Sequence, residues 1–135
     1  NEQSARPQSE IALQAQQRFL AQERAKPDVR ELAGGILLTE LKAGNGPQPS
    51  AEGSVQVRYV KRLPDGSVFD QNAQPQWFRL DSVISGWRSA LPQMQVGATW
   101  RLVIPADQAY GAEGAGDLIA PFTPLVFEIE LVNVR

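Results

Sequence analysis

The spacing of apolar residues changes along the chain and separates a leading segment from a larger second part. Up to residue 31, Gln, Ala, Glu and Arg predominate, and apolar residues recur at the intervals of one helix face. Ile11, Ala15 and Phe19 follow one another at intervals of four residues, and Leu13 and Leu20 are one heptad apart. The pattern predicts an amphipathic helix from Ser9 to Lys26, because Pro27 prevents it from continuing. We expect this helix either to pack on the second part or to project from it.

From residue 36 onward, apolar and polar residues alternate, as they do in strands with one buried face. The predicted strands cover residues 36–41, 55–59, 68–69, 76–80, 100–104 and 125–131. Turn-forming residues separate them, as in Gly44–Pro47 and Leu63–Gly66. Residues 83–94 have helical spacing instead, and Pro92 limits that helix to a few turns.

This order of elements predicts an α+β fold, in which an antiparallel sheet with one short helix is preceded by an N-terminal helix. We assign residues 1–31 to a leader that contains the first helix, and residues 32–135 to one domain.

Residues 105–124 are the longest stretch of the second part without periodicity. Loops of more than about 12–15 residues in a compact domain are usually functional or disordered. This one contains Gly111, Gly114 and Gly116, yet it also retains apolar residues such as Tyr110 and Ile119. We therefore expect it to fold over another part of the domain rather than to be a solvated linker.

Composition restricts the chemistry that this chain could perform. Its 135 residues include no His and no Cys, which excludes a Ser-His-Asp triad, a thiol nucleophile and a zinc site built from His or Cys. The carboxylates are scattered, so we expect no metal and no cofactor. With 13 Lys and Arg against 15 Asp and Glu, the chain is a poor candidate for binding nucleic acid. No apolar run approaches the roughly 20 residues that a transmembrane helix needs.

The sequence contains more residues suited to binding an apolar ligand than residues suited to acid-base catalysis, because aromatic residues are concentrated in the second part of the chain. The candidate pocket residues are Tyr59, Phe69, Phe78, Val83, Ile84, Trp87, Tyr110, Ile119 and Phe127. Aromatic residues that face inward from strands are usually core, so the residues alone leave a ligand pocket and a plain core equally open. Asp70 follows Phe69, and its carboxylate either accepts a hydrogen bond from a hydroxyl such as that of Tyr59 or serves in a turn.

The order and spacing of several short motifs resemble the FKBP-type peptidyl-prolyl cis–trans isomerases. The matching stretch runs from about residue 35 to residue 135. Its motifs are Gly46–Pro49, Val55–Tyr59, Leu63–Asp70, Phe78–Leu80, Val83–Trp87, Ala90–Gly97, Ile104–Pro105, Ala109–Gly111 and Leu125–Leu131. The helix and Pro27–Val29 ahead of the first strand look like the bacterial Mip-like branch, named after the macrophage infectivity potentiator.

This resemblance implies a twisted antiparallel sheet wrapped around the short helix, and an enzyme that accelerates the isomerisation of X-Pro bonds in protein folding. In the family, the residue at Trp87 is the floor of the pocket, while the Ile84 amide and the Tyr110 hydroxyl hold substrate carbonyls. The resemblance assigns catalytic roles to Tyr59, Asp70 and Tyr110. It assigns substrate binding to Phe69, Phe78, Val83, Ile84, Trp87, Ile119 and Phe127.

The sequence departs from the family pattern at several positions around the pocket. Arg58, Val60 and Lys61 stand where relatives commonly have His, Thr and Gly. Ala120 interrupts an Ile-Pro-Pro sequence in the loop, and Gln76 replaces an apolar or aromatic residue at the rim. These changes leave a second function open, namely a peptide-binding or chaperone module of the same fold with weak or no isomerase activity.

The resemblance also implies partners and a location. Proline-containing polypeptides would be the substrates, the macrolides that bind the family would be inhibitors, and the chain would act as a monomer or as a dimer through its N-terminal helix. Mip-like relatives are often periplasmic or associated with the outer membrane. The chain starts with Asn1 rather than Met, as it would after removal of a signal peptide. We expect a periplasmic or outer-membrane-associated protein, with the cytoplasm as the alternative.

Overall fold

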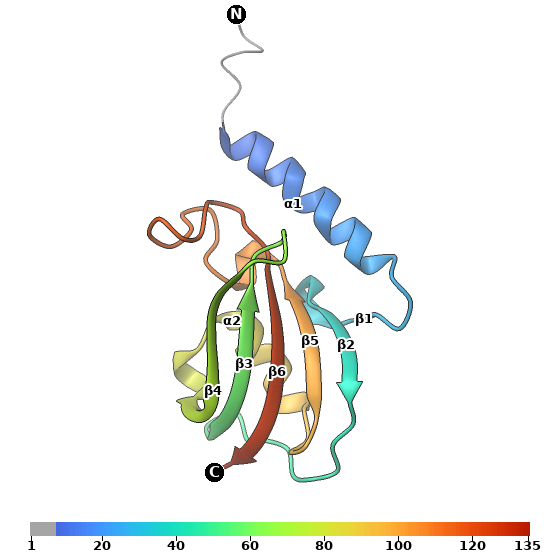
Figure 1. The fold of residues 1–135 in the computed structure, drawn as a ribbon, viewed down its shortest axis with the longest axis vertical. Helices are drawn as coiled ribbons and strands as arrows, with labels where there is room; N and C mark the ends of the chain where they lie inside the picture. The colour runs from blue at the N-terminus through green and yellow to red at the C-terminus, as the bar shows by residue number, and fades with distance from the viewer. Residues whose placement is uncertain (1–7) are drawn as a thin grey trace, which may run out of the picture.

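A six-stranded sheet organises residues 8–135, the part of the chain that the computed structural model describes (Figure 1). The strands are β1 (Arg30–Glu31), β2 (Leu37–Lys42), β3 (Ser54–Arg62), β4 (Val68–Arg79), β5 (Thr99–Ile104) and β6 (Leu125–Val134). Their order across the sheet is β1-β2-β5-β6-β3-β4, and every neighbouring pair is antiparallel. The helix α1 (Gln8–Arg24) packs on one face, and the short helix α2 (Ser85–Ala90) packs on the other. The predicted α+β fold is confirmed.

The strand β4 is longer than the sequence pattern predicts. Alternation predicts separate strands over residues 68–69 and 76–80, whereas β4 is unbroken across both. Its pairing with β3 shifts register between Val57 and Tyr59. There Asn72 replaces part of the ladder, because its Oδ1 accepts a hydrogen bond from the Tyr59 amide at 2.6 Å and its Nδ2 donates to the Val57 carbonyl at 3.1 Å. A register shift interrupts the alternation of faces, so the pattern does not show that the strand continues.

The sheet face that contacts α2, here called the inner face, carries the main core. Its fully buried side chains include Ile36, Leu38, Val55, Val57, Leu80, Leu91, Leu102, Ile104, Leu125, Ile129 and Leu131. Gly86 lets α2 come close to the sheet, because a Cβ at this position would lie 2.5 Å from the Ile104 side chain. The helix is shorter than the predicted range, since Ile84 has an extended backbone and Leu91–Gln93 forms a 3-10 turn around Pro92.

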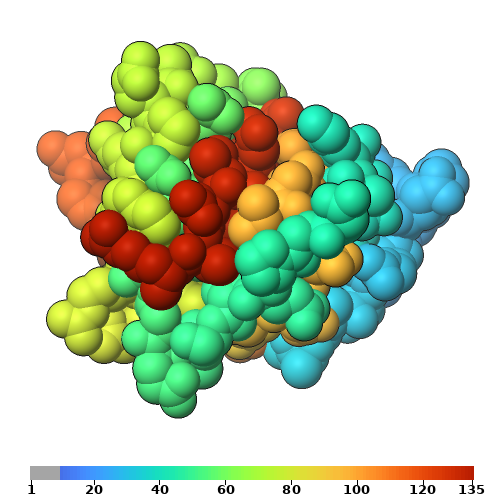
Figure 2. Space-filling model, turned by 90° about the horizontal axis from the view of Figure 1, so that it is seen from below, coloured from blue at the N-terminus to red at the C-terminus, as the bar shows by residue number. Residues whose placement is uncertain are grey.

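The opposite face, here called the outer face, carries a smaller apolar cluster of Leu37, Val103 and Val126. Phe19 and Leu20 of α1 pack against this cluster. Seen from below in Figure 2, the blue N-terminal segment lies at the end of the molecule beside β2, and the yellow-green β4 lies at the other end. Phe19 and Leu20 of α1 thus contact side chains of β2, β5 and β6.

Two polar residues of α1 are buried at this contact, which the apolar spacing of the helix does not predict. The Gln16 Oε1 accepts a hydrogen bond from the Ala106 amide at 2.7 Å. The Glu23 carboxylate lies 2.6 Å from the Arg101 guanidinium, and the Glu23 side chain is 7% exposed. These contacts satisfy polar groups that α1 would otherwise bury without partners.

The first turns of α1 face solvent more than the predicted apolar stripe suggests. Ile11 and Leu13 remain 43% and 38% exposed, and Ala15 is also exposed. The helix itself is confirmed, but only the Phe19 and Leu20 part of the stripe contacts the sheet. The stripe overestimates the contact because spacing reports which residues share a helix face, and not how far the sheet extends beneath them.

Candidate functional site

Two cavities in the described part of the chain are candidates for a binding site. The larger, of about 370 Å³, lies between α1, the turn after β3 and the loop of residues 105–124. The smaller, of about 170 Å³, lies on the inner face beside α2, and most of the predicted site residues line it. Apolar pockets with a few converging polar groups are the usual form of a ligand site. The smaller cavity has this form, since aromatic rings surround it and the Tyr110 hydroxyl stands among them.

Four aromatic rings contact one another at this cavity, and three of them, Phe78, Trp87 and Phe127, line it. Trp87 is central, with ring centroids 5.6 Å from Tyr59, 5.7 Å from Phe78 and 5.4 Å from Phe127, all in edge-to-face contact. Tyr59 and Phe78 also touch at 5.9 Å. We call these four residues the aromatic cup. Edge-to-face pairs stabilise each other, by about 0.5–1.5 kcal/mol per pair beyond the burial of area, so the cup is a rigid surface.

The residues of the cup come from separate elements that the fold brings together. Tyr59 is on β3, Phe78 on β4, Phe127 on β6 and Trp87 on α2. Trp87 is 3% exposed and reaches the cup because Gly86 brings α2 against the sheet. The geometry therefore depends on the docking of α2.

The hydroxyl of Tyr59 is held by a carboxylate. It donates a hydrogen bond to the Asp70 Oδ2 at 3.3 Å, which is the contact expected from the sequence. Burial, the negative charge of Asp70 and this hydrogen bond raise the pKa of Tyr59 above its ordinary value of 10.0. The Tyr59 hydroxyl therefore stays protonated at neutral pH and orients toward Asp70.

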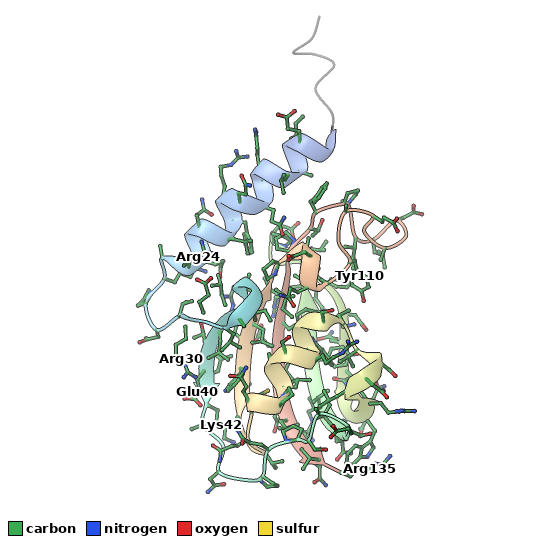
Figure 3. The ribbon with its side chains drawn as sticks, turned by 180° about the vertical axis from the view of Figure 1, so that it is seen from behind. Arg24, Arg30, Glu40, Lys42, Tyr110 and Arg135 are labelled. Atoms are coloured by element: carbon green, nitrogen blue, oxygen red, sulfur yellow. The ribbon has the colours of Figure 1, made fainter. Side chains whose placement is uncertain are left out.

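The loop after β5 places Tyr110 at the cavity. Figure 3 shows Tyr110 at the base of this loop, above α2 in this view. Backbone hydrogen bonds fold the loop on itself, since the Gly111 amide donates to the Ala106 carbonyl at 2.6 Å and the Phe122 amide donates to the Gly111 carbonyl at 3.0 Å. As the sequence predicts, the loop is not a free linker, because its Ile119 is 4% exposed and belongs to the main core.

The structure brings most of the predicted site residues to one place. Those that line the cavity are Phe78, Val83, Ile84, Trp87, Tyr110 and Phe127. Tyr59 contacts this set through its ring and Asp70 contacts it through Tyr59. Phe69 and Ile119 do not line the cavity and instead pack in or against the main core.

Two lining residues, Lys61 and Ser82, are absent from the predicted set. Lys61 could have been found from the strand period alone, because it follows Tyr59 by two residues and so shares its face. Ser82 lies in the 3-10 turn Leu80–Ser82 ahead of α2, and no signal in the sequence separates it from an ordinary connection.

The available chemistry is that of a dry apolar surface with hydroxyl and amide donors. Among residues 8–135, no group of carboxylates could hold a metal ion. Ile84 immediately precedes α2, so its amide has no partner within that helix and lies beside the cavity. The Tyr110 hydroxyl is a second donor, and the two can bind carbonyl groups of a ligand seated in the cup.

Comparison with known proteins agrees with this geometry. Residues 46–132 match the model of the family described as FKBP-type peptidyl-prolyl cis-trans isomerase. A probable FKBP-type 25 kDa peptidyl-prolyl cis-trans isomerase of Pseudomonas aeruginosa is 59% identical over 121 residues, covering 90% of this chain and 53% of that protein. The outer membrane protein MIP of Legionella longbeachae is 38% identical over 120 residues, covering 87% of this chain and 52% of that protein.

A solved structure shows the same fold. The crystal structure of a peptidyl-prolyl cis-trans isomerase from Pseudomonas syringae superposes with a TM-score of 0.93 at 70% identity, covering 96% of this chain and 97% of that one. The chain spans about half the length of the two curated relatives described above. The matched family model, the sequence identity and the aromatic cup together show that this chain belongs to the family of FKBP-type peptidyl-prolyl cis-trans isomerases.

Proposed function

We propose that this chain is a peptidyl-prolyl cis-trans isomerase that accelerates X-Pro isomerisation in protein folding. The observation that supports this function best is the aromatic cup, in which Trp87 lies beneath a cavity whose edge carries Tyr110. Its volume of about 170 Å³ suits a small apolar ring. A proline side chain is such a ring.

The reaction needs little of the chemistry that this chain lacks. Rotation about a peptide bond meets a barrier of about 18–20 kcal/mol because of amide resonance. No covalent bond forms or breaks and no proton must move, so the absence of His and Cys is no obstacle. Lowering the barrier by about 4 kcal/mol would accelerate the exchange roughly a thousandfold.

Each part of the cavity has a role in lowering that barrier. The cup removes the proline ring from water, and a dry environment favours the twisted amide, which has lost its resonance and is less polar than the planar form. The Tyr110 hydroxyl and the Ile84 amide hold carbonyls of the substrate chain, so that the remaining carbonyl can turn. Tyr59 and Asp70 complete the wall on the side of β3 and β4.

The function is tested with a protein whose refolding is limited by proline isomerisation. We expect the wild-type chain to accelerate the slow refolding phase, which otherwise takes tens to hundreds of seconds. If the chain binds a proline peptide but does not accelerate refolding, the isomerase function is contradicted. A peptide-binding or chaperone module would then be the function. A bound macrolide should quench or shift the fluorescence of Trp87 in a saturable manner, because the ligand would lie against its ring.

Assembly and domain limits are further proposals. We take residues 1–31 as the leader with its helix and residues 32–135 as the isomerase domain. The chain acts as a monomer or as a dimer through α1, and the exposed Leu13 is an apolar residue that a dimer would bury. Sedimentation equilibrium of the wild type and of Leu13→Lys separates these two states.

The proposed location is the periplasm or the outer membrane. The support is the similarity to the outer membrane protein MIP of Legionella longbeachae. Within residues 8–135, no helix combines the length and hydropathy that crossing a membrane requires. Fractionation of cells that express the full-length gene, followed by detection in the periplasmic, membrane and cytoplasmic fractions, tests the location.

A further inference from the structure

Lys61 is the charged residue among the described side chains that line the cavity. It lies on β3, directly opposite Asp70 in the ladder with β4 and opposite Phe127 in the ladder with β6. Its side chain is 21% exposed, so the ammonium is at the rim, partly shielded from water. The rim of the cup therefore carries the Lys61 ammonium beside the Asp70 carboxylate.

The position of the ammonium is fixed by its neighbours. The Lys61 Nζ lies 5.2 Å from the centroid of the Tyr59 ring and 6.0 Å from that of Trp87, over the rings in both cases. A cation in this position is attracted by the aromatic faces. The charge thus stands at the edge of the cavity in which we propose that the proline ring binds.

The one carboxylate paired with Lys61 leaves it able to bind another. The Nζ lies 3.5 Å from the Asp70 Oδ2, longer than a good hydrogen bond, and the Asp70 side chain is 47% exposed. An ammonium has three donors, so a second carboxylate can bind without displacing Asp70.

Neighbouring cations do not share this role. Arg58 and Arg62 are on the other side of β3, and they pair with Glu130 and Glu128 at 3.1 Å and 2.9 Å. Their charges are therefore neutralised on the outer face, away from the cup.

We propose that Lys61 forms a subsite for an acidic side chain, so that the enzyme favours X-Pro bonds with Asp or Glu directly beside the proline. This inference rests on the proposed isomerase function and names the substrate class of the same cavity. A carboxylate next to the proline meets the ammonium at a partly desolvated rim, where the attraction between charges is stronger than in bulk water. A basic side chain at the same position is repelled.

The test compares peptides whose two ends are chemically blocked and therefore uncharged, and which differ from one another in one residue. Each contains one proline, with Glu, Gln or Lys placed directly before or directly after it, and kcat/KM for cis-trans exchange is measured without a coupling protease. We expect the wild type to prefer Glu over Gln about three- to fivefold on at least one side of the proline. The preference should shrink toward unity at about 0.5 M NaCl, because salt screens the interaction at the rim.

Variants locate the preference at Lys61. Lys61→Met keeps the length of the side chain and should bring the ratio of kcat/KM for the Glu and Gln peptides to about one, whatever the activity of the variant on each peptide, and Lys61→Arg should keep the wild-type ratio. Arg62→Met is the matched control, since it removes one cation from the outer face and should leave the preference unchanged. Comparing the same peptides across variants cancels their intrinsic rates of exchange.

The outcomes separate this inference from the proposed function. If the wild type accelerates none of the peptides, the isomerase function fails. If it accelerates the Glu and Gln peptides equally, or if Lys61→Met keeps the Glu preference, the function stands and the acidic subsite is wrong. Thermal unfolding of each variant checks the fold, and if Lys61→Met is unfolded, the salt dependence of the wild-type preference decides the question.

Discussion

On the inner face of the sheet, Trp87 meets Phe78 and Phe127 edge to face, and the three rings line a cavity. On the outer face, Leu37, Val103 and Val126 are covered by α1, and the contact is completed by buried polar side chains. Both faces bury apolar residues, but the cavity of the inner face is lined by three aromatic rings in mutual contact around Trp87. The comparison teaches that burial by itself does not indicate a site. A site needs rigid side chains that do not fill the space between them.

The two faces also differ in how they are held. The inner face relies on aromatic packing and on the close approach of α2 at Gly86. The outer face relies on α1 and on charged and amide groups, because Gln16 and Glu23 are buried with specific partners. Changes on the inner face should therefore affect activity and stability together, whereas changes on the outer face should affect stability alone.

The largest expected effect is that of Trp87→Leu. It removes the base of the cup and should lower both the free energy of unfolding, by roughly 2–4 kcal/mol, and kcat/KM, more than tenfold. The matched control is Trp100→Leu, because Trp100 is also a buried core tryptophan, 5% exposed, but does not line the cavity. Urea unfolding and the peptide assay give both quantities. Equal losses of activity in the two variants would show that activity follows stability and not the cup.

A smaller and more selective effect is expected for Tyr110→Phe. The ring remains and only the hydroxyl is lost, so stability should change by less than about 0.5 kcal/mol. The rate should fall about tenfold, which corresponds to one hydrogen bond to a substrate carbonyl. Phe19→Ala on the outer face provides the opposite pattern, with reduced stability and unchanged kcat/KM. Unchanged activity of Tyr110→Phe would remove this hydroxyl from the mechanism.

The smallest effect concerns Glu23 on the outer face and depends on pH. Burial alone would raise the pKa of Glu23, but hydrogen bonds from Lys26 and Arg101 outweigh it and lower the pKa below its ordinary value of 4.5. A carboxyl whose pKa is lower in the folded chain than in the unfolded chain stabilises the fold at pH values above its unfolded pKa. This stabilisation disappears as the pH falls through the folded pKa.

We therefore expect Glu23→Gln to lower the free energy of unfolding by about 1 kcal/mol at pH 7, with unchanged isomerase activity. The difference between wild type and variant should narrow as the pH falls below 4.5, because the wild-type carboxyl then becomes protonated. Urea unfolding at a series of pH values measures it. A constant difference at all pH values would show that the Arg101 contact does not depend on the charge of Glu23.

The sequence pattern predicts which helices and strands exist more completely than it predicts where each of them begins and ends. The strands β3, β5 and β6 follow the predicted alternation, and α1 ends close to the predicted position. The continuity of β4 was not predictable, because the register shift at Asn72 and its side-chain hydrogen bonds depend on the partner strand. The short β1 was not predicted either, since two residues are too few for a periodic pattern.

The candidate site was predictable in its membership but not in its shape. The motifs around Tyr59, Val83 and Trp87 indicated which residues belong together, mostly through resemblance to the family. They did not show that Phe69 packs against the core outside the cavity, or that Lys61 stands over the rings. Those placements depend on how strands from distant parts of the chain pair.

Local periodicity and motif spacing were enough to indicate the fold class and the family, and composition excluded groups that need His or Cys. Only the tertiary structure decided which aromatic residues surround an open volume and which face of α1 is buried. It also placed Lys61 at the rim of the cup. The physical reason is that alternation fixes the face of a residue within its own strand, whereas a cavity forms where side chains of several elements fail to fill the space between them.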